Sequence, residues 1–179
     1  MGLLTLVVGG ARSGKSRFAE QMAAAHRGVT YLATAQAGDA EMARRIATHR
    51  RRRAEQAPGW VTIEEPWVVA PVVAAPGPAG GCVLLECLTL WVTNLLLGLP
   101  GRPALDDEEI GRRVGLLIDA ARAGPGRLIV VSNEVGCGIV PDNALARRFG
   151  DVLGEANQRL AAAAAEVYGC VAGIPVRIK

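Results

Sequence analysis

Eight residues near the amino terminus, GGARSGKS from Gly9 to Ser16, carry the clearest chemistry in the sequence. In the spacing G-x-x-x-x-G-K-S, the glycines let backbone N–H groups turn toward an anion, the lysine reaches the β- and γ-phosphates, and the serine hydroxyl can hold magnesium. Lys15 and the terminal Lys179 are the only lysines, although the chain has 20 basic residues. A compact ammonium therefore occurs where a crowded phosphate site would need one. The pattern predicts a phosphate-binding P-loop.

A second group of chemically active residues lies between residues 39 and 56, where the sequence predicts a helix. On a helix, Arg45, His49, Arg52 and Arg53 share one face, so an imidazole is flanked by guanidinium groups. Acidic partners are too few to neutralise this face, and arginine forks match phosphate oxygens, so we interpret it as binding a polyanion. A solvated charged face and an RNA-binding surface are the alternatives. Aromatic residues that could stack on bases make up only 4% of the chain, which disfavours RNA.

Polar residues follow two predicted strands. The strand at 29–34 ends in Thr34-Ala35-Gln36, and the continuous apolar strand at 82–86 ends in Glu86. Ligands of open α/β sheets sit beyond the carboxyl ends of the strands, so both endings are expected near the P-loop, although the first could equally be ordinary loop. An unpaired buried Glu is costly, and P-loop proteins place an acid at such a strand end to act on magnesium. Glu86 and Ser16 are therefore the candidate magnesium ligands.

Strands and helices alternate along the chain. Strands are predicted at 3–8, 29–34, 60–64, 82–86 and 128–132, with one or two more in 169–179, and helices at 17–25, 39–56, 91–97, 106–123 and 144–167. The apolar segment 68–75 is a candidate short helix. The alternating pattern of 60–64 indicates a half-buried strand. The order predicts an α/β fold of the P-loop nucleoside triphosphate hydrolase kind, with a mainly parallel sheet flanked by helices. At 179 residues, the chain is expected to form one catalytic domain, residues 1–179.

The composition indicates the class of protein and its expected location in the cell. The chain is 50% apolar and 21% charged with a net charge of +3, which is typical of a compact globular protein and gives no separate support for nucleic-acid binding. The apolar run 82–100 contains Glu86 and Asn94, whose burial in hydrocarbon is costly, so we interpret it as a buried strand and helix without membrane insertion. The four cysteines form no C-x-x-C pair and the first residues lack a basic signal region, so a cytoplasmic location is expected.

Several segments together resemble one enzyme family. GGARSGKSRFAE, YLATAQ, ARRIATHRRRR, LLECLTLWVTNLL and SNEVGCGIVPDNALARRFGD, with NQRLA after it, are similar in this order to the bifunctional adenosylcobinamide kinase / adenosylcobinamide-phosphate guanylyltransferase of cobalamin biosynthesis. The resemblance implies that ATP or GTP phosphorylates the aminopropanol hydroxyl of adenosylcobinamide. It further implies that GTP then transfers GMP to that phosphate, giving adenosyl-GDP-cobinamide and pyrophosphate. Mg²⁺ and a homo-oligomer, a trimer, are implied as well.

The resemblance also implies roles for individual residues. Family members form a covalent GMP–histidine intermediate on the helix after the second strand, which here places the nucleophile at His49, with Lys15 as the second catalytic residue. Some relatives have two adjacent histidines, whereas this chain has Thr48-His49. The implied nucleotide contacts are Gly9, Gly10, Ala11, Arg12, Ser13, Gly14, Lys15, Ser16, Thr34, Ala35, Gln36, Arg51, Arg52, Arg53, Ala54, Glu64 and Glu86.

The presence of one P-loop leads to the hypothesis that a single triphosphate site serves both reactions. The loop at 133–136 and the segment after it are our candidates for the corrinoid side of the site. Two other functions remain open. One is a P-loop ATPase or GTPase switch without a small-molecule acceptor, which would hydrolyse nucleotide without forming a covalent adduct. The other is an RNA-binding module that uses Arg50 to Arg53 and would bind in a salt-dependent manner.

Overall fold

The structure is a computed structural model that describes residues 2–38, 40–56, 59–75 and 81–179; the side chains of residue 45 and residues 52–56 lie outside the description. The elements alternate as the sequence predicts. They are β1 (Leu3–Gly9), α1 (Lys15–Ala24), β2 (Val29–Ala33), α2 (Ala40–Gln56), β3 (Val61–Glu64), α3 (Val69–Ala74), β4 (Cys82–Glu86), α4 (Leu88–Leu97), α5 (Asp107–Ala123), β5 (Arg127–Asn133), α6 (Ala144–Ala163), β6 (Glu166–Val171) and β7 (Ile174–Arg177).

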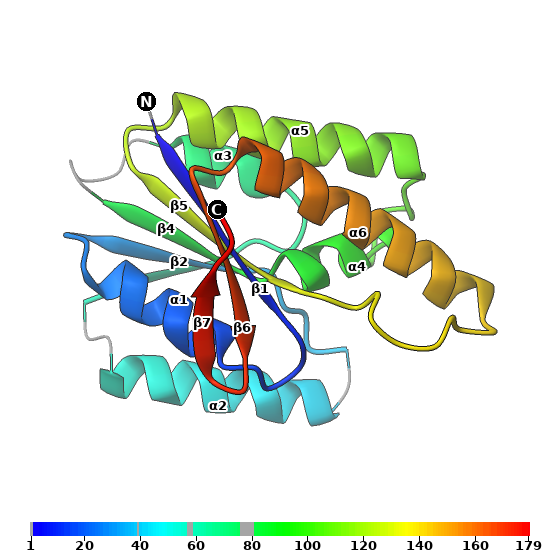
Figure 1. The fold of residues 1–179 in the computed structure, drawn as a ribbon, viewed down its shortest axis with the longest axis horizontal. Coiled ribbons are helices and arrows are strands. Elements are labelled where there is room, and N and C mark those ends of the chain that lie inside the picture. Colours follow the sequence, from blue (N-terminus) through cyan, green and yellow to red (C-terminus); the bar gives the residue numbers. More distant parts are fainter. Residues whose placement is uncertain (1, 39, 57–58, 76–80) are drawn as a thin grey trace.

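The strands form a seven-stranded sheet in the order β3-β2-β4-β5-β1-β6-β7 (Figure 1). All neighbouring pairs are parallel except β6 and β7, which form an antiparallel hairpin. Parallel pairing brings the carboxyl ends of six strands to one edge of the sheet, where ligands of such folds bind. Strand β5 lies between β1, which leads into the P-loop, and β4, which ends in Glu86.

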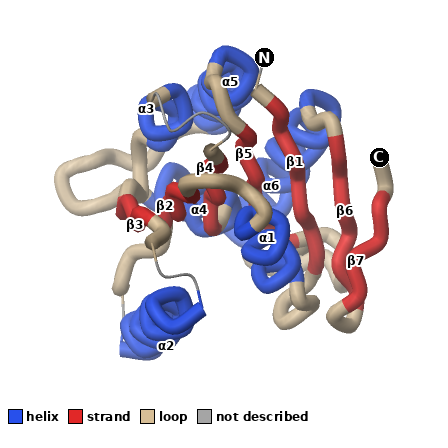
Figure 2. The backbone as a smooth tube through the Cα atoms, turned by 90° about the vertical axis from the view of Figure 1, so that its left-hand side faces the viewer, coloured by secondary structure: helices blue, strands red, loops and turns tan. Residues whose placement is uncertain are grey.

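Helices cover both faces of the sheet (Figure 2). Helix α1 lies on one face, whereas α3, α4, α5 and α6 lie on the other. On the first face Ala19 and Ala23 of α1 are buried with Ile129, and on the second Trp91 and Leu153 belong to a larger buried cluster. Burying each large apolar side chain contributes roughly 1.5–3 kcal/mol, so these two layers hold the strand ends in place.

Four predicted boundaries and one predicted burial pattern are wrong. Helix α4 begins at Leu88 rather than residue 91, and β6 begins at Glu166 rather than within 169–179. Helix α6 ends at Ala163 rather than residue 167, because the chain turns into β6 and pairs with β1. The alanine run at 161–165 favours helix by propensity, but strand pairing overrides that preference. All four residues of strand β3 are exposed rather than alternately buried, and in the described part of the chain β3 is an edge strand that pairs with β2 alone. Helix α1 begins at Lys15, inside the P-loop motif, rather than at residue 17.

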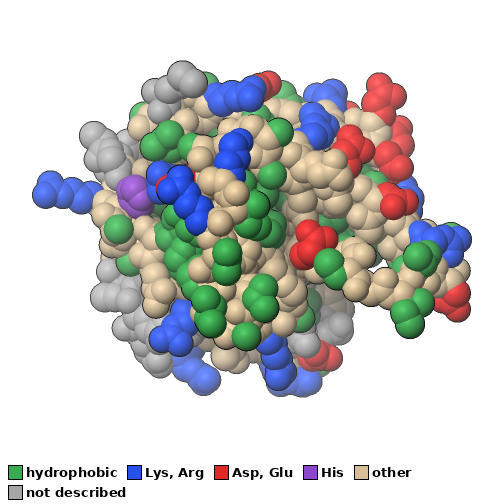
Figure 3. Space-filling model, viewed as in Figure 1, with side chains coloured by type: hydrophobic (Ala, Val, Ile, Leu, Met, Phe, Trp, Pro, Cys, Tyr) green, Lys and Arg blue, Asp and Glu red, His purple; other side chains and the backbone are tan. Residues whose placement is uncertain are grey.

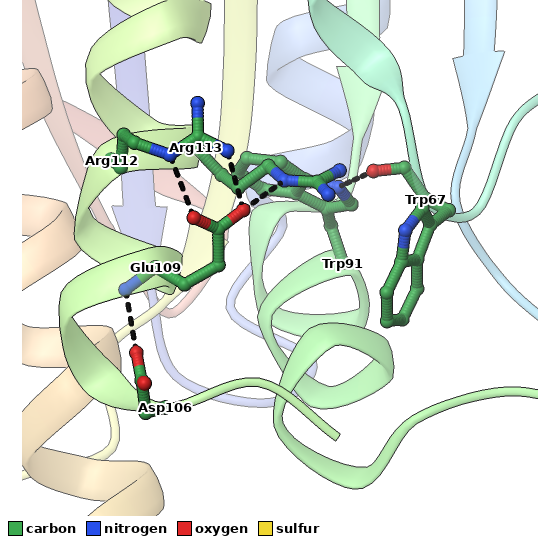
Figure 4. Close-up of polar contacts among 6 residues, drawn as sticks. All are labelled: Trp67, Trp91, Asp106, Glu109, Arg112 and Arg113. Atoms are coloured by element: carbon green, nitrogen blue, oxygen red, sulfur yellow. Dashed lines mark hydrogen bonds and ion pairs between the residues drawn. The ribbon is translucent and has the colours of Figure 1, made fainter. Parts of the chain in front are cut away.

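A compact polar cluster joins α5 to α4 and to the segment after β3 (Figure 4); its members are Trp67, Trp91, Asp106, Glu109, Arg112 and Arg113. The Glu109 carboxylate accepts hydrogen bonds from Arg112 Nε at 2.6 Å and Arg113 Nε at 3.0 Å. These bonds lower the pKa of Glu109 to about 2. The Arg113 guanidinium lies 5.7 Å from the centroid of the Trp67 ring, and Trp91 Nε1 donates to the Trp67 carbonyl at 3.0 Å. The cluster therefore fixes α5 to its neighbours through paired polar groups.

The β6–β7 hairpin carries apolar side chains on its outer surface. Val171, Ile174, Val176 and Ile178 are each more than half exposed, and Figure 3 shows apolar side chains gathered over this hairpin. Strand β7 is thus an edge strand with an apolar outer row. In the described part of the chain, no helix has both the length and the apolar character needed to span a membrane, and the apolar run 82–100 divides into β4 and α4.

Candidate nucleotide-binding site

A cavity of about 650 Å³ opens at the carboxyl edge of the sheet. The P-loop, the start of α1, the ends of β2, β3, β4 and β5, and one face of α2 contribute to its wall. Its lining residues are Ala11, Arg12, Ser13, Gly14, Lys15, Ser16, Arg17, Tyr31, Ala33, Ala35, Met42, Ile46, His49, Arg50, Glu64, Glu86, Cys87, Leu90 and Asn133. The fold thus brings the P-loop, an acid at a strand end and a histidine together around one space.

The P-loop requires glycine for reasons visible in its neighbours. A Cβ atom at Gly9 would lie 2.6 Å from the carbonyl oxygen of Cys170, and one at Gly14 would lie 2.9 Å from the Cα atom of Gly173. Gly14 also has a positive φ of 91°, which favours glycine. The N–H of Gly173 donates to the carbonyl of Ser13 at 2.9 Å, so the turn between β6 and β7 is hydrogen-bonded to the P-loop and packs against it.

Helix α1 begins at the P-loop without a capping side chain among the described residues. In contrast, Asp106 caps α5 and Asn143 caps α6. The first N–H groups of a helix have no partner within it, so at α1 they remain available to a bound anion. Lys15 Nζ donates to the carbonyl of Gly10 at 3.2 Å, which holds the ammonium group close to the loop.

Two oxygen-bearing side chains meet below the P-loop. The Ser16 hydroxyl donates to Glu86 Oε1 at 2.7 Å, and this hydrogen bond connects the first turn of α1 with the end of β4. Hard oxygen ligands of this kind are those that Mg²⁺ prefers, and in phosphate sites Mg²⁺ uses few protein ligands and completes its shell with phosphate oxygens and water. The donor set therefore fits a magnesium ion.

Helix α2 presents a mixed face to the cavity. Met42, Ile46, His49 and Arg50 line it, at i, i+4, i+7 and i+8 on the helix. The three arginines predicted to flank His49 have side chains outside the description. Arg50 instead forms an ion pair with Glu64 of β3. Both side chains are about half exposed, so the pair contributes little to stability, but it joins α2 to β3 beside the cavity.

The other predicted contacts divide into two sets. Ala35 lines the cavity. Thr34 is fully buried and does not line it; its hydroxyl donates to the Cys87 carbonyl at 2.8 Å and accepts from the Cys87 N–H at 2.9 Å, which joins β2 to β4. Gln36 and Arg51 are exposed and lie outside the lining, as do Gly9 and Gly10 at the start of the loop. The side chains of Arg52, Arg53 and Ala54 lie outside the description.

The sequence does not predict seven of the lining residues: Arg17, Tyr31, Ala33, Met42, Ile46, Cys87 and Leu90. It places Asn133 in the candidate corrinoid loop and Arg50 in an RNA-binding alternative, and both residues line this cavity. The helical spacing back from His49 could have identified Met42 and Ile46. Among these residues, Cys87 carries a side chain of a nucleophilic type. However, burial, and after it the negative charge of Glu86, raises the pKa of its thiol to about 12, so it stays protonated at neutral pH.

A model of the family described as "Cobinamide kinase / cobinamide phosphate guanyltransferase" matches residues 5–178. The chain belongs to this family. It is 46% identical over 175 residues to the bifunctional adenosylcobalamin biosynthesis protein CobP of Pseudomonas aeruginosa, covering 97% of this chain and 96% of that protein. It is 44% identical over 184 residues to the protein CobU of Escherichia coli, covering 99% of this chain and all of the relative.

Family membership confirms the resemblance found in the sequence. It makes the chain an enzyme with kinase and nucleotidyltransferase activity in cobalamin biosynthesis. Among solved structures, the RadB recombinase is similar with a TM-score of 0.51 and 17% identity, over 94% of this chain and 74% of that one. At this identity the likeness concerns the fold alone, and it agrees with the predicted P-loop class.

Proposed function

We propose that this enzyme carries out two successive reactions in assembling the nucleotide loop of cobalamin. First, the aminopropanol hydroxyl of adenosylcobinamide receives the γ-phosphoryl group of ATP or GTP. Second, GMP is transferred from GTP to the new phosphate through a GMP–histidine intermediate on His49. The products are adenosyl-GDP-cobinamide and pyrophosphate. The relatives' names and the composition of the cavity support this proposal.

In the kinase step, the acceptor oxygen attacks the γ-phosphorus while the bond between that phosphorus and the β,γ-bridging oxygen breaks. The nucleoside diphosphate leaves, and the hydroxyl proton passes to solvent or a nearby base. Lys15 and the open N–H groups of α1 would bind the phosphate oxygens. Such catalysis depends mostly on positioning and on neutralising charge, which a preformed cradle supplies.

In the guanylyl-transfer step, a nitrogen of neutral His49 attacks the α-phosphorus of GTP. The bond from that phosphorus to the α,β-bridging oxygen breaks, and pyrophosphate leaves. The acceptor's phosphate oxygen then attacks the same phosphorus, the P–N bond breaks, and the imidazole is regenerated. Lys15 would stabilise the charge that develops on pyrophosphate. The same cradle thus holds the β- and γ-phosphates in both reactions.

One observation carries this proposal: Lys15, Ser16 and His49 line the same cavity. Lys15 and Ser16 come from the P-loop, whereas His49 comes from α2, which lies far along the chain. A triphosphate bound by its terminal phosphates would extend from the P-loop across this space. A switch ATPase would need the P-loop but would have no use for a histidine there.

Magnesium is part of the proposal. Ser16 and Glu86 would hold it, because their oxygens already lie side by side. The ion would neutralise part of the charge on the phosphate oxygens when bound. The residues of the chain would still orient the triphosphate, since the P-loop backbone and Lys15 determine where its β- and γ-phosphates lie.

The decisive experiment is covalent labelling with GTP that carries the label on the α-phosphate. We expect wild-type protein to retain acid-labile, base-stable label, as a phosphoramidate does, and His49→Ala to lose it by at least about 100-fold because the nucleophile is gone. His26→Ala is the matched control. His26 follows α1 at the opposite edge of the sheet, so its label should equal that of the wild type.

Two outcomes would contradict the proposal. Label retained in His49→Ala would remove that residue from its role. Hydrolysis of GTP by the wild type without any covalent label would favour the switch function instead. A Lys15→Ala variant that retained both activities would show that the two reactions do not share the P-loop cradle.

A further inference from the structure

Asn133 lies at the centre of the carboxyl edge of the sheet and has no role in the two reactions proposed above. It is the last residue of β5, the strand that lies between the P-loop strand β1 and the acid-bearing strand β4. In the sheet register its Cα atom pairs with that of Gly9, where the P-loop begins. Asn133 also lines the cavity together with Lys15, Ser16 and Glu86. It therefore lies where the terminal phosphates of a nucleotide would come between the loop and the acid.

Side chains from two helices fix the backbone of Asn133. Its N–H donates to Thr89 Oγ1 of α4 at 2.8 Å, and its carbonyl accepts from Asn157 Nδ2 of α6 at 3.1 Å. Thr89 is 6% exposed and Asn157 is 8% exposed. Buried polar side chains are costly unless they are hydrogen-bonded, so two such groups directed at one residue indicate that its position matters. The next N–H, of Glu134, donates to the Gly9 carbonyl at 3.2 Å and ties this point to the P-loop.

In contrast to the backbone groups of Asn133, its side-chain oxygen Oδ1 is buried without a hydrogen-bond partner among the described residues. Buried side-chain amides in folded proteins are nearly always hydrogen-bonded, so an open one beside a cavity indicates a partner outside the chain. The two ends of the amide exchange places by rotation about χ2, so either the oxygen or the NH₂ group can turn toward that partner.

We propose that Asn133 binds the γ-phosphoryl group of the nucleoside triphosphate. This deepens the proposed function and rests on it. The amide NH₂ would donate to a γ-phosphoryl oxygen, which can only accept, while Lys15 and the start of α1 hold the triphosphate from the P-loop side. With the β-phosphate held in the P-loop, Asn133 would contact only the γ-phosphoryl group, and it would therefore distinguish a triphosphate from a diphosphate. Its rigid backbone would place the γ-phosphorus for attack in the kinase step.

The test compares the binding of GTP and GDP, each with Mg²⁺, to the purified protein by titration calorimetry. A hydrogen bond to a charged oxygen is strong, so Asn133→Ala should weaken GTP binding by about 10- to 100-fold. GDP binding should change by less than about twofold, because the lost contact is to the γ-phosphate. Asn133→Asp keeps the shape of the side chain but adds a negative charge, so its GTP binding should fall further while GDP binding again changes little.

The matched control is Asn143→Ala, which makes the same chemical change at the amino terminus of α6, outside the cavity lining. It should bind both nucleotides as the wild type does. Circular dichroism of each variant checks that it is folded. Equal losses for GTP and GDP, or no loss for GTP in either Asn133 variant, would overturn the role of Asn133. Failure of the proposed function looks different: wild-type protein would then hydrolyse GTP without retaining label from its α-phosphate, whatever the Asn133 variants do to GTP and GDP binding.

Discussion

The polar cluster around α5 and the polar groups around the nucleotide cavity contrast in how their hydrogen bonds are satisfied. Around α5, Asp106 caps the helix, the two arginines bind Glu109, and Trp91 donates to the carbonyl of Trp67 (Figure 4). Around the cavity, the buried atoms Ser13 Oγ and Asn133 Oδ1 have no hydrogen-bond partner among the described residues. Helix α5 begins with a capping side chain, whereas α1 begins without one in the described structure.

This difference separates stabilising polar groups from groups arranged for a ligand. A buried group left without a partner costs roughly 1–3 kcal/mol, so such groups beside a binding cavity are candidates for contact with a bound molecule. In the α5 cluster the partners come from the chain itself, and their loss should lower stability. At the cavity the partners would come from the nucleotide, and removing the groups should lower binding rather than stability.

The largest effect is expected in the α5 cluster, from Trp67→Ala. Trp67 is buried and packs in the larger core cluster, and the guanidinium groups of Arg102 and Arg113 lie 5.5 and 5.7 Å from the centroid of its ring. Truncating a buried tryptophan leaves a large cavity, so the free energy of unfolding should fall by about 3–5 kcal/mol. Urea unfolding followed by circular dichroism measures this change, while GTP affinity of the folded variant should stay within about twofold of the wild type.

Trp60→Ala provides the control, because Trp60 is only partly buried and should cost clearly less. If Trp67→Ala left stability unchanged but weakened GTP binding, the division between the two clusters would be wrong.

A smaller effect concerns the pH dependence of stability at Glu109. Its pKa is lowered to about 2, first by hydrogen bonds from Arg112 and Arg113, from an ordinary value of 4.5. The folded state therefore favours the ionised form. The resulting stabilisation is complete above about pH 5 and is lost as the pH falls through the window between 4.5 and 2. Urea midpoints should be higher for the wild type than for Glu109→Gln at pH 7, and the two should converge toward pH 2.

Other carboxylates titrate in both proteins, so only the difference between the two curves reports on Glu109. A constant difference from pH 7 to pH 3 would show that the pairing does not depend on the charge of this carboxylate.

Much of the fold could be predicted from the sequence because local patterns agree with the tertiary structure. The P-loop spacing, the apolar strand ending in Glu86, and the alternation of strands and helices each depend on nearby residues. The predictions failed where a distant partner decides the outcome. Helix α6 ends early because β6 pairs with β1, and the exposed β3 is the edge strand beside β2 in the sheet that the described residues form.

The candidate site could be predicted in part for the same reason. Lys15, Ser16 and Glu86 belong to local motifs and line the cavity, and His49 joins them from α2. Thr34 was expected to face the ligand because it ends a strand, but its hydroxyl is bonded to Cys87. Asn133 ends a strand as well, yet its importance emerges only from the contacts with Thr89 and Asn157, which the sequence cannot show.

We expect the smallest change in stability for Ser13→Ala. This variant also tests most directly the difference between polar groups bonded within the chain and those open at the cavity. The Ser13 hydroxyl is buried without a hydrogen-bond partner among the described residues, so its removal should change the free energy of unfolding by less than about 0.5 kcal/mol, or raise it slightly. Thr34→Val is the matched control, because it deletes a buried hydroxyl that donates and accepts, and it should cost about 1–3 kcal/mol.

For nucleotide binding we expect the opposite order: Ser13→Ala should lose more affinity for GTP than Thr34→Val does. If the Ser13 hydroxyl binds a phosphate oxygen of the nucleotide, GTP with Mg²⁺ should raise the melting temperature of Ser13→Ala less than that of Thr34→Val. Each rise is measured against the same variant without nucleotide. Ser13→Ala could instead lose as much stability as Thr34→Val and keep the full GTP-induced rise in melting temperature. The Ser13 hydroxyl would then stabilise the fold, as the polar groups around α5 do, and would not bind the nucleotide. The open polar atoms at the cavity would then not all be arranged for the nucleotide.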